Sequence, residues 1–487
     1  MAKTGKDDPR QMLRYLPSIE ELLSQMGRRA NSLASDARAN LARRVVAGLR
    51  SEIEEGTFRP GSKDEVLRQA VREADASAAA LLGQHPVPVI NAAGVILHTN
   101  LGRAPLAQEA LRAINAAAAG YSNLEYDLSK GERGSRLAHL EEMLCVLSGA
   151  PAALAVNNNA GAVFLALNTM AEGKEVIVSR GHLVEIGGSF RMPAIMEKSG
   201  ARLVEVGTTN KTHLKDFEQA ITRRTGLILH VHQSNFVQKG FVNQVPVREL
   251  ISMAHRHGVP VMDDQGSGIL CDPGLLGAPD EPTVLESLEA GVSVVSFSGD
   301  KLLGGSQAGI VCGESEWIAQ MKANPLARAL RLDKLQLTAL EATIRLYLTG
   351  RADVGIPVRS MVLASSAELK KRAGALRDAL RAAVKEDAVD RKVAPALTVK
   401  LMEVSSVLGG GSSPEVELPD WGVALKLKEP GLTASGLERA LREGRPPVVA
   451  RVSEEQVILT IRGVFTKQGE QLPDLIVRAL KRMRTRH

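Results

Sequence analysis

The arrangement of polar and apolar residues changes twice along the chain. The first 84 residues have the pattern of helices, and Ser18 and Glu21 form a capping box that opens the run IEELLSQM. Further helices are predicted at about 35–55 and 63–82. The segment 84–88 then has the turn and breaker residues of a linker, so we place a domain boundary there.

From about residue 88 to 385, short apolar runs alternate with segments of helix length. The runs lack a clean alternation of polar and apolar positions, which is typical of strands buried on both faces. They are residues 175–178, 203–206, 227–231, 259–262, 292–297 and 309–311. Pro246 and Gly258 mark the two ends of one connecting helix. The alternation predicts a mostly parallel α/β sheet, in which ligands bind beyond the carboxyl ends of the strands.

The last part of the chain is predicted to form a smaller α/β domain. Its expected elements are helices at about 330–348 and 365–384 and strands near Val399, at 423–427 and at 457–461. A Gly/Ser-rich loop at 409–413 interrupts it. We therefore expect three domains: a helical domain over 1–84, a catalytic core over 85–385 and a small domain over 386–487.

Composition narrows the class of protein. The 487 residues are 44% hydrophobic and 24% charged, which is typical of a globular chain. The net charge of +6 permits a polyanionic partner without requiring one, and 3% aromatic residues argue against binding nucleic acid mainly by base stacking. Cys145, Cys271 and Cys312 form no cluster, so we expect neither disulfides nor a metal site. No segment suits a membrane span or a secretory signal, so we expect a cytoplasmic protein without a DNA partner.

The sharpest candidate for chemistry is Lys301, in the segment SFSGDKLLGG that directly follows a buried-type strand. A neutral lysine amine can attack an aldehyde, and burial favours the neutral form by lowering the pKa. The small residues around Lys301 leave room for a bulky planar cofactor. The competing interpretation is a surface lysine in a turn.

Three further elements follow predicted strands. Asp263, followed by Asp264, can pair with a protonated pyridine nitrogen, although it can equally cap a loop or bind magnesium. Residues 157–162, NNNAGA, open a helix whose backbone N–H groups can hold a phosphate; the members assigned to it are Asn158, Asn159, Ala160 and Gly161. The alternative there is a plain N-cap. His182 can stack on a planar ring, but a lone histidine is more often structural.

These four elements occur in one order along the chain: phosphate cup, stacking residue, carboxylate and lysine. That order is the one required by the pyridoxal 5'-phosphate (PLP) enzymes of the aspartate-aminotransferase type. The pattern Ser298-x-x-Lys301 also matches serine acyl-transfer enzymes, but no K-T-G element accompanies it. His230 and His232 alternate on a strand without a convergent carboxylate or thiol, so a structural role is favoured over metal binding.

Arginines form the next group of candidates. Arg103 and Arg136 lie in Gly-rich turns, and Arg328 and Arg331 are expected to share one helix face. Guanidinium groups at the mouth of a PLP site can clamp an oxyanion through two hydrogen bonds. A solvated helix face or a subunit-interface ion pair is the alternative for each of them.

Five segments have sequences similar to those of one family. They are 16–23 (LPSIEELL), 91–106 (NAAGVILHTNLGRAPL), 121–127 (YSNLEYD), 157–162 (NNNAGA) and 298–305 (SGDKLLGG). On these segments the chain resembles bacterial selenocysteine synthase, L-seryl-tRNA(Sec) selenium transferase. The resemblance covers essentially the whole chain and is most specific from 88 to 350.

The resemblance implies a fold-type-I PLP-dependent transferase, with a mostly parallel sheet covered by helices on both faces, that assembles as a homodecamer. It implies that Lys301 holds PLP, and that Arg103, Arg136, Arg328 and Arg331 line the pocket for selenophosphate and the substrate. The implied reaction replaces the hydroxyl group of seryl-tRNA(Sec) by selenium. Lys301 then takes the Cα proton, and Asp300 or a nearby arginine assists the departure of hydroxide.

The resemblance also implies that the N-terminal helical domain grips the tRNA. Six arginines there suit phosphate contacts, or form a solvated face: Arg28, Arg29, Arg38, Arg43, Arg44 and Arg50. A related set of PLP proteins acts on small amino compounds and lacks this domain. A lyase or transferase of that kind is the alternative function.

Overall fold

The computed structural model describes residues 9–186, 190–233, 236, 238–277, 279, 281–390, 397–411 and 416–485. The chain forms two compact units, Met1–Pro88 and Val89–His487. The boundary predicted after residue 385 falls inside a helix of the second unit, α18 (Ser366–Asp390). No described helix combines the length and the apolar composition that crossing a membrane requires.

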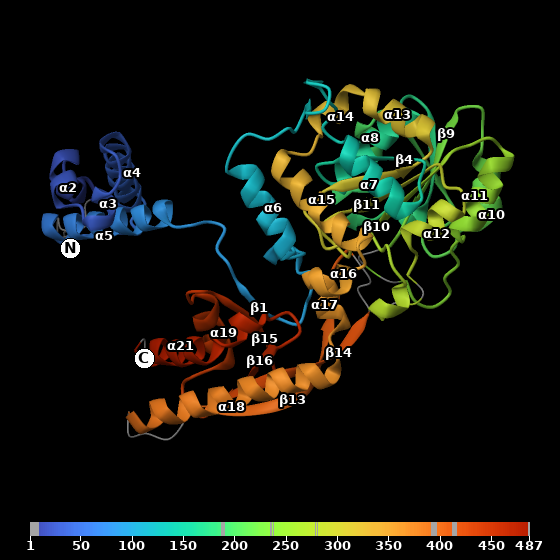
Figure 1. The fold of residues 1–487 in the computed structure, drawn as a ribbon. Coiled ribbons are helices and arrows are strands. Elements are labelled where there is room, and N and C mark those ends of the chain that lie inside the picture. Colours follow the sequence, from blue (N-terminus) through green and yellow to red (C-terminus); the bar gives the residue numbers. More distant parts are fainter. Residues whose placement is uncertain are drawn as a thin grey trace. The chain divides into compact units, whose positions relative to one another are not determined.

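The first unit consists of helices around one apolar core. Its elements are α1 (Pro9–Met12), η1 (Leu13–Tyr15), α2 (Ile19–Gln25), α3 (Arg28–Asn31), α4 (Ser35–Glu54) and α5 (Lys63–Leu82) (Figure 1). Of the predicted capping box, the Ser18 half is confirmed at α2, where the Ser18 hydroxyl accepts a hydrogen bond from the Glu21 N–H at 3.1 Å, while Glu21 Oε2 lies 2.9 Å from Lys63 Nζ. Leu22, Leu49 and Val66 are fully buried among the helices. The unit thus has a core of its own.

The second unit contains a seven-stranded sheet in the order β4-β12-β11-β10-β9-β5-β8. The strands are β4 (Ala152–Val156), β5 (Glu175–Ser179), β8 (Arg202–Val206), β9 (Thr225–Val231), β10 (Val261–Gly266), β11 (Val294–Ser298) and β12 (Gly309–Gly313). Only β12 runs against the others. The predicted apolar runs are confirmed as strands, and the predicted mostly parallel sheet is confirmed with them.

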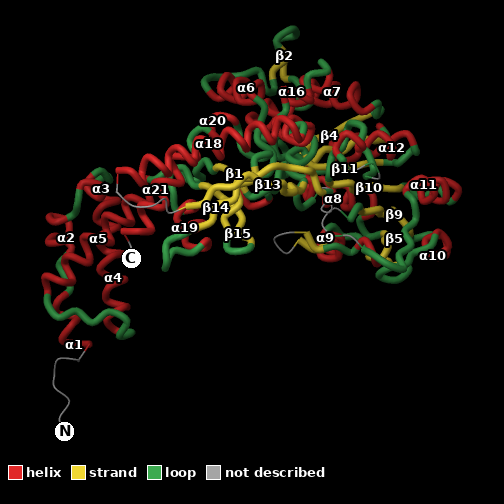
Figure 2. The backbone as a smooth tube through the Cα atoms, turned by 90° about the horizontal axis from the view of Figure 1, so that it is seen from below, coloured by secondary structure: helices red, strands yellow, loops and turns green. Residues whose placement is uncertain are grey.

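Helices cover both faces of this sheet (Figures 1 and 2). One face packs on α7 (Ala138–Ser148), α10 (Leu214–Ala220), α11 (Val247–Arg256), α12 (Val284–Glu289) and α15 (Lys334–Leu348). The other packs on α8 (Asn159–Ala171), α9 (Met192–Lys198) and α13 (Ser315–Ala323). Successive strand residues therefore point into different cores. Pro246 and Gly258 flank α11 as predicted.

A second sheet of five strands has the order β1-β15-β16-β14-β13. The strands are β1 (Ile90–Ala92), β13 (Leu397–Val407), β14 (Glu417–Leu427), β15 (Val448–Ser453) and β16 (Gln456–Thr460). It packs on α18, α19 (Ala434–Arg442) and α21 (Leu472–Thr485). The strands predicted near Val399, at 423–427 and at 457–461 are confirmed, whereas β1 and β15 were not predicted.

The pairing of β1 with β15 brings the start of the second unit into the small sheet. Ile90 pairs with Val448 in parallel register. Further along, the Ile96 N–H donates to the Val407 carbonyl at 3.0 Å and the Leu97 N–H donates to the Leu408 carbonyl at 2.7 Å. The segment that precedes the large sheet is therefore hydrogen-bonded to segments that follow it in the chain.

Shorter elements complete the second unit. They are η2 (Thr99–Leu101), α6 (Gln108–Ala118), β2 (Tyr126–Asp127), β3 (Glu132–Arg133), η3 (Arg180–His182), β6 (Glu185–Ile186), β7 (Phe190–Arg191), η4 (Pro273–Leu276), α14 (Pro325–Ala329), α16 (Ala352–Gly355), α17 (Pro357–Leu363) and α20 (Thr466–Gly469). Residues 412 and 413 of the predicted Gly/Ser-rich loop lie outside the described residues. The first eight residues, where no secretory signal was expected, also lie outside them.

Candidate functional site

Lys301 lies just beyond the carboxyl end of β11 and is buried, with 6% of its surface exposed. The turn that carries it is held from two sides. The Leu302 N–H donates to the Ser267 carbonyl at 3.2 Å, and the Tyr347 hydroxyl donates to the Leu303 carbonyl at 2.9 Å. The interpretation as a surface lysine is therefore wrong.

Burial lowers the pKa of the Lys301 amine from 10.5 to about 8, although the negative charges of Asp264 and Asp300 oppose the shift. Removing the amine from water penalises its charged form, while a nearby carboxylate stabilises that form. About a tenth of the molecules carry a neutral amine at pH 7 with this pKa, against well under a hundredth for an ordinary lysine. The Lys301 amine is therefore prepared for attack on an aldehyde.

The lowered pKa predicts how the reaction of Lys301 with an aldehyde depends on pH. Only the neutral amine attacks, so the rate should rise as pH rises and level off above a midpoint near 8. Mixing the cofactor-free protein with PLP over a series of pH values, and following the visible absorbance of the attached cofactor, measures this midpoint. A midpoint near 10.5 would contradict the effect of burial.

The two adjacent aspartates of β10 point to opposite faces of the sheet. Asp264 accepts hydrogen bonds from Asn159 Nδ2 at 2.8 Å and from the Ser296 hydroxyl at 2.9 Å. Burial raises the pKa of the Asp264 carboxyl, against the effect of these two donors. Since its charge also acts on Lys301, Asp264 lies on the side of the candidate site.

Asp263, the carboxylate that the sequence analysis favoured, lies on the other face. His230 Nδ1 is 2.7 Å from its Oδ1, and the Ser287 hydroxyl donates to its Oδ2 at 2.6 Å. Burial alone would raise the pKa of Asp263, but the hydrogen bonds and charge of His230 and the Ser287 hydroxyl hold it below its ordinary value. The structure thus brings Asp264 rather than Asp263 toward Lys301.

The asparagine cluster lies at the carboxyl end of β4, where α8 begins. The Asn158 side chain caps this helix by accepting a hydrogen bond from the Gly161 N–H at 2.8 Å. Asn159 Nδ2 donates to Asp264, and Ala160, the second residue of α8, is half-buried. The predicted phosphate cup therefore borders the same space as Asp264, and Asn158 also acts as the plain N-cap that was the alternative.

Three buried polar atoms around this space have no hydrogen-bond partner within the described part of the chain. They are Asn157 Oδ1, Asn159 Oδ1 and Ser267 Oγ. Buried polar atoms in proteins are nearly always paired, so each unpaired atom calls for an explanation. A polar ligand bound among these residues supplies one, and a phosphorylated pyridine aldehyde has the groups to do so.

His182 is buried at the carboxyl end of β5, against the neighbouring strand β9. Its Nδ1 accepts a hydrogen bond from the Val231 N–H at 3.4 Å, and its ring meets the ring of His230 edge-on at 4.8 Å. Burial, together with the charge of His230, lowers the pKa of His182 to about 3. The imidazole is therefore neutral; its stacking on a cofactor ring stays a prediction.

His230 in β9 and His232, which follows that strand, are each paired with a carboxylate, contrary to the expectation that none converges on them. His230 contacts Asp263, and His232 Nε2 is 2.6 Å from Glu281 Oε1. Among the described residues, no group of three or more His, Cys, Asp or Glu side chains is arranged to hold a metal ion. These contacts agree with the structural role that the sequence favoured.

The predicted arginines separate into two groups. Arg103 Nη1 forms an ion pair with Asp300 Oδ2 at 2.8 Å, directly beside Lys301. Arg136 binds Glu125 through Nε and Nη2 at 2.9 and 2.6 Å, and Arg331 Nη1 lies 3.6 Å from the same carboxylate. The hydrogen bonds from Arg136 hold the pKa of Glu125 below its ordinary value. Glu125 thus gathers guanidinium groups, a role that the sequence did not reveal.

The expectation that Arg328 and Arg331 share one helix face is wrong. Helix α14 ends at Ala329, and Arg331 instead forms an antiparallel bridge with Val156 at the end of β4. The next helix starts only at Lys334, because the Asp333 carboxylate caps the N–H groups of the following turn. Arg331 is thereby placed next to the asparagine cluster, while the Arg328 side chain is exposed.

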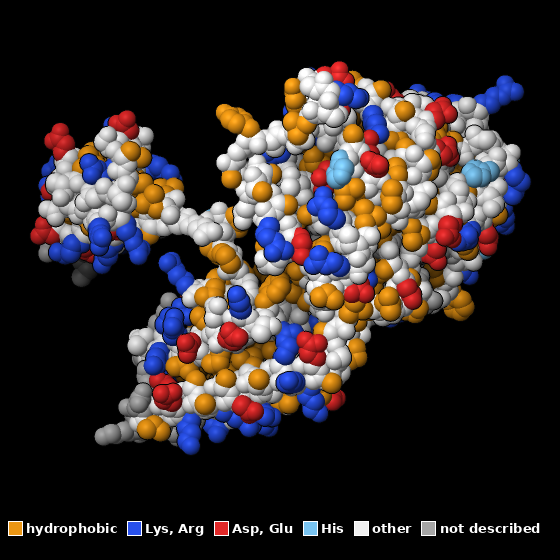
Figure 3. Space-filling view, in the orientation of Figure 1, with side chains coloured by type: hydrophobic (Ala, Val, Ile, Leu, Met, Phe, Trp, Pro, Cys, Tyr) orange, Lys and Arg blue, Asp and Glu red, His pale blue; other side chains and the backbone are white. Residues whose placement is uncertain are grey.

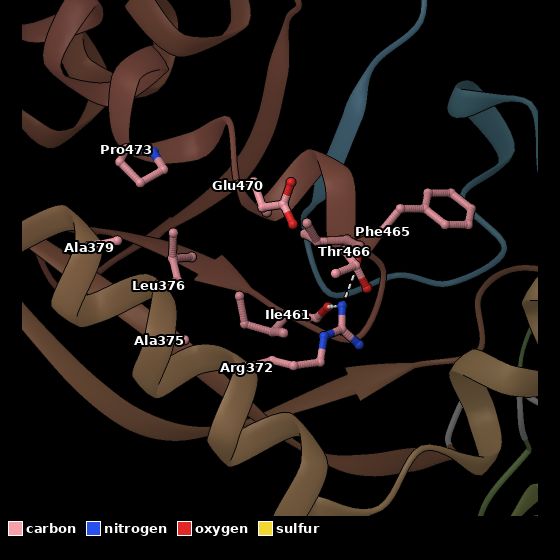
Figure 4. Close-up of a pocket in the computed structure, with 11 residues that line it drawn as sticks. Arg372, Ala375, Leu376, Ala379, Ile461, Phe465, Thr466, Glu470 and Pro473 are labelled. Atoms are coloured by element: carbon pink, nitrogen blue, oxygen red, sulfur yellow. Dashed lines mark hydrogen bonds between the residues drawn. The ribbon is translucent and has the colours of Figure 1, made fainter.

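Two of the pockets differ in their lining: the first includes one of the predicted arginines, Arg136, and the second includes none of them. One of about 510 Å³ lies between the hairpin β2–β3 and the helices α7 and α15, and Arg136, Lys334 and Glu341 are among its lining residues. The other, of about 310 Å³, lies between α18 and the segment that leads into α21 (Figure 4). There Arg372 donates to the carbonyls of Ile461 and Val464, so its guanidinium holds the loop in place.

Comparison with known proteins identifies the family. A family model described as L-seryl-tRNA selenium transferase matches residues 89–465. The chain belongs to this family. A curated L-seryl-tRNA(Sec) selenium transferase of Moorella thermoacetica is 45% identical over 484 residues, covering 97% of this chain and 98% of the relative. One of Aquifex aeolicus (strain VF5) is 44% identical over 455 residues, covering 93% and 96%. The resemblance noted from the sequence is confirmed.

The fold of this chain is similar to that of a solved structure of D-glucosaminate-6-phosphate ammonia-lyase. The TM-score is 0.56 at 22% identity, over 83% of this chain and 97% of that chain. Together with the sheet order and the helices on both faces, this likeness confirms the expected fold class, fold type I.

Proposed function

We propose that this chain converts L-seryl-tRNA(Sec) into L-selenocysteinyl-tRNA(Sec), with selenophosphate as the selenium donor and PLP as the cofactor. Near full-length similarity to selenium transferases supports the reaction class. The observation that carries the chemistry is the buried Lys301, which faces the charge of Asp264 at the ends of two neighbouring strands.

The residues of the site fit PLP. Lys301 Nζ would bind the aldehyde carbon, Asp264 would face the pyridine nitrogen, and the first residues of α8 with Ser267 would hold the phosphate. The unpaired Ser267 hydroxyl and the unpaired oxygens of Asn157 and Asn159 support this assignment. PLP, when bound, supplies an electron sink for the bond that breaks at Cα of the substrate.

The chain's own residues move the protons. With PLP bound, Lys301 Nζ would accept the Cα proton of the seryl group, and the Arg103–Asp300 pair beside Lys301 would assist the departure of hydroxide from Cβ. Selenium of selenophosphate then bonds to Cβ, and Lys301 returns a proton to Cα. Hydrolysis of the phosphorus–selenium bond releases phosphate.

The arginines near Glu125 are proposed to bind the selenophosphate oxyanion. Arg136 and Arg331 converge on one carboxylate and lie along the 330–332 segment that borders Asn157. A planar guanidinium can form two parallel hydrogen bonds to a phosphate-type group. Arg328, exposed one turn earlier, is proposed to extend this cluster.

We also infer that copies of the chain assemble, with a ring of ten as the expected form. Several large apolar side chains of the second unit are exposed, which suits surfaces that another copy covers. They include Tyr121, Leu128, Phe241 and Val354. The tRNA is proposed to bind the helical unit.

The proposed function is tested by incubating the protein with PLP, Ser-tRNA(Sec) and selenophosphate, then hydrolysing the tRNA ester and identifying the amino acid. Selenocysteine is the expected product, and none should form without selenophosphate. If the protein instead releases ammonia from, or adds groups to, a free small amino compound while leaving Ser-tRNA(Sec) unchanged, the alternative function replaces this one.

The opposite faces of Asp263 and Asp264 predict different effects of the two Asp→Asn substitutions. Asp264→Asn should lower turnover by about 10²–10⁴-fold and alter the absorbance of bound PLP, because the charge facing Lys301 is lost. Asp263→Asn should mainly reduce the free energy of unfolding, by about 1–3 kcal/mol, because a buried charge-assisted contact is weakened. Steady-state kinetics and denaturant unfolding of both variants provide the comparison, and the reverse assignment of effects would contradict it.

A further inference from the structure

A loop of the small sheet reaches the lysine of the large sheet. After β13 ends at Val407, the chain continues through Leu408 to Gly411. This loop is fixed in place because the Val407 N–H donates to the Gly94 carbonyl at 2.9 Å and the Leu408 carbonyl accepts from the Leu97 N–H at 2.7 Å. Hydrogen bonds between backbone groups therefore fix the start of this loop.

Gly411 is the residue of this loop that meets Lys301. A Cβ atom built on Gly411 would lie 2.6 Å from Lys301 Nζ and 2.7 Å from Lys301 Cε. Separations below 3.0 Å are not tolerated by real Cβ atoms, so any side chain here would displace the lysine or the loop. Gly411 is also buried and has a φ of +85°.

The preceding glycines have different surroundings. A Cβ on Gly409 would lie 2.6 Å from the Leu97 carbonyl oxygen, so this glycine permits the close approach of two backbone segments. A Cβ on Gly410 would have only Thr99 Oγ1 nearby, at 3.9 Å. Of the three glycines, only Gly411 has the reactive amine as its neighbour.

The reaction proposed for Lys301 requires space at Nζ. When the amine attacks an aldehyde, a carbon–nitrogen bond forms at Nζ, and the carbonyl oxygen leaves as water with the two amine protons. The carbon is tetrahedral in between, so the reaction needs more room than the amine alone. An atom 2.6 Å from Nζ would occupy part of that room.

We propose that Gly411 is a positioning residue for Lys301, and that its missing side chain keeps open the space in which Nζ reacts with the cofactor aldehyde. This inference rests on the proposed function, since it takes Lys301 as the residue that holds PLP. It assigns the small sheet a part in the chemistry: the segment 408–411, which follows β13, lies against the Lys301 side chain. The sequence analysis placed no site residue there.

The test compares Gly411→Ala with Gly431→Ala in the full-length protein. Gly431 has almost the same φ, +86°, but a Cβ there would meet nothing within 4 Å, so both variants carry the same backbone strain and only one carries the contact. The readout is the rate of PLP attachment to Lys301, followed by visible absorbance and verified by borohydride reduction and peptide mass. We expect Gly411→Ala to attach PLP at least about tenfold more slowly than the parent, and Gly431→Ala to match the parent.

A second measurement keeps the inference testable if Gly411→Ala is poorly stable. The contact requires the lysine side chain, so Gly411→Ala should lower the melting temperature less in a Lys301→Ala background than in the parent. Equal losses in both backgrounds, or PLP attachment as fast in Gly411→Ala as in the parent, would overturn the inference. A parent protein that attaches no PLP would instead refute the proposed function.

Discussion

Replacing Lys301 with alanine is expected to abolish both the visible absorbance of bound PLP and the formation of selenocysteinyl-tRNA(Sec), with a loss of activity greater than about 10³-fold. Two tasks are removed at once: the covalent bond to the cofactor and the group that accepts the Cα proton. Because the turn is held by hydrogen bonds of the Leu302 N–H and the Leu303 carbonyl, which do not involve the Lys301 side chain, the fold should persist. Absorbance spectra and single-turnover conversion of Ser-tRNA(Sec) measure the two losses.

Two further variants separate these tasks from general effects of losing a positive charge. Lys301→Arg retains the charge but has no amine that attacks an aldehyde, so it should be as inactive as Lys301→Ala. Lys426→Ala removes an exposed lysine of β14 and should leave both signals unchanged. Retention of the PLP absorbance in Lys301→Ala would mean that another residue holds the cofactor.

The strand ends were the part of the site that the sequence could predict. Buried parallel strands are short apolar runs, and the residues that follow them must meet at one edge of the sheet. This reasoning placed Lys301, the asparagine cluster and the Asp263–Asp264 pair at that edge, and the structure brings them there. It required no knowledge of which strands are neighbours.

Because β10 is buried on both faces, the sequence could not predict which of its two aspartates faces the lysine. A strand with one solvated face shows alternating polar and apolar residues, and this alternation reveals the side to which each residue points. In β10, all six residues from Val261 to Gly266 are buried, so the pattern contains no such signal. A shift by one residue exchanges Asp263 and Asp264. Only the contacts with Asn159 and His230 decide between them.

Contacts between distant segments were out of reach for a different reason. The pairing of Ile90 with Val448 and the approach of Gly411 to Lys301 depend on the tertiary arrangement, for which local patterns carry no information. The break before α15 was different, because Asp333 is an N-cap residue that could have been recognised in the sequence. Recognising it would have separated Arg331 from Arg328.

The second large effect is expected when the first unit is removed, and it concerns the affinity for tRNA. A protein that starts at residue 89 should lose most of its affinity for tRNA(Sec) while it still attaches PLP, because the sheets and Lys301 belong entirely to the second unit. Five of the six arginines proposed for tRNA binding are exposed, and Lys and Arg side chains are visible on the surface of this unit in Figure 3. Filter binding at several salt concentrations measures the loss.

The salt dependence identifies the kind of contact that is lost. If the arginines bind phosphates, about six such contacts make affinity for nucleic acid fall by roughly 10³-fold between about 50 and 200 mM salt. Arg43 and Arg44 are exposed neighbours on α4, and the described part of the chain gives neither an ion pair. Replacing either with glutamine should lower the slope of log affinity against log salt by about one and weaken binding of any tRNA alike. Unchanged slopes in these variants, with full affinity in the protein that starts at residue 89, would assign tRNA binding to the second unit, because only its surface would then remain to contact the phosphates.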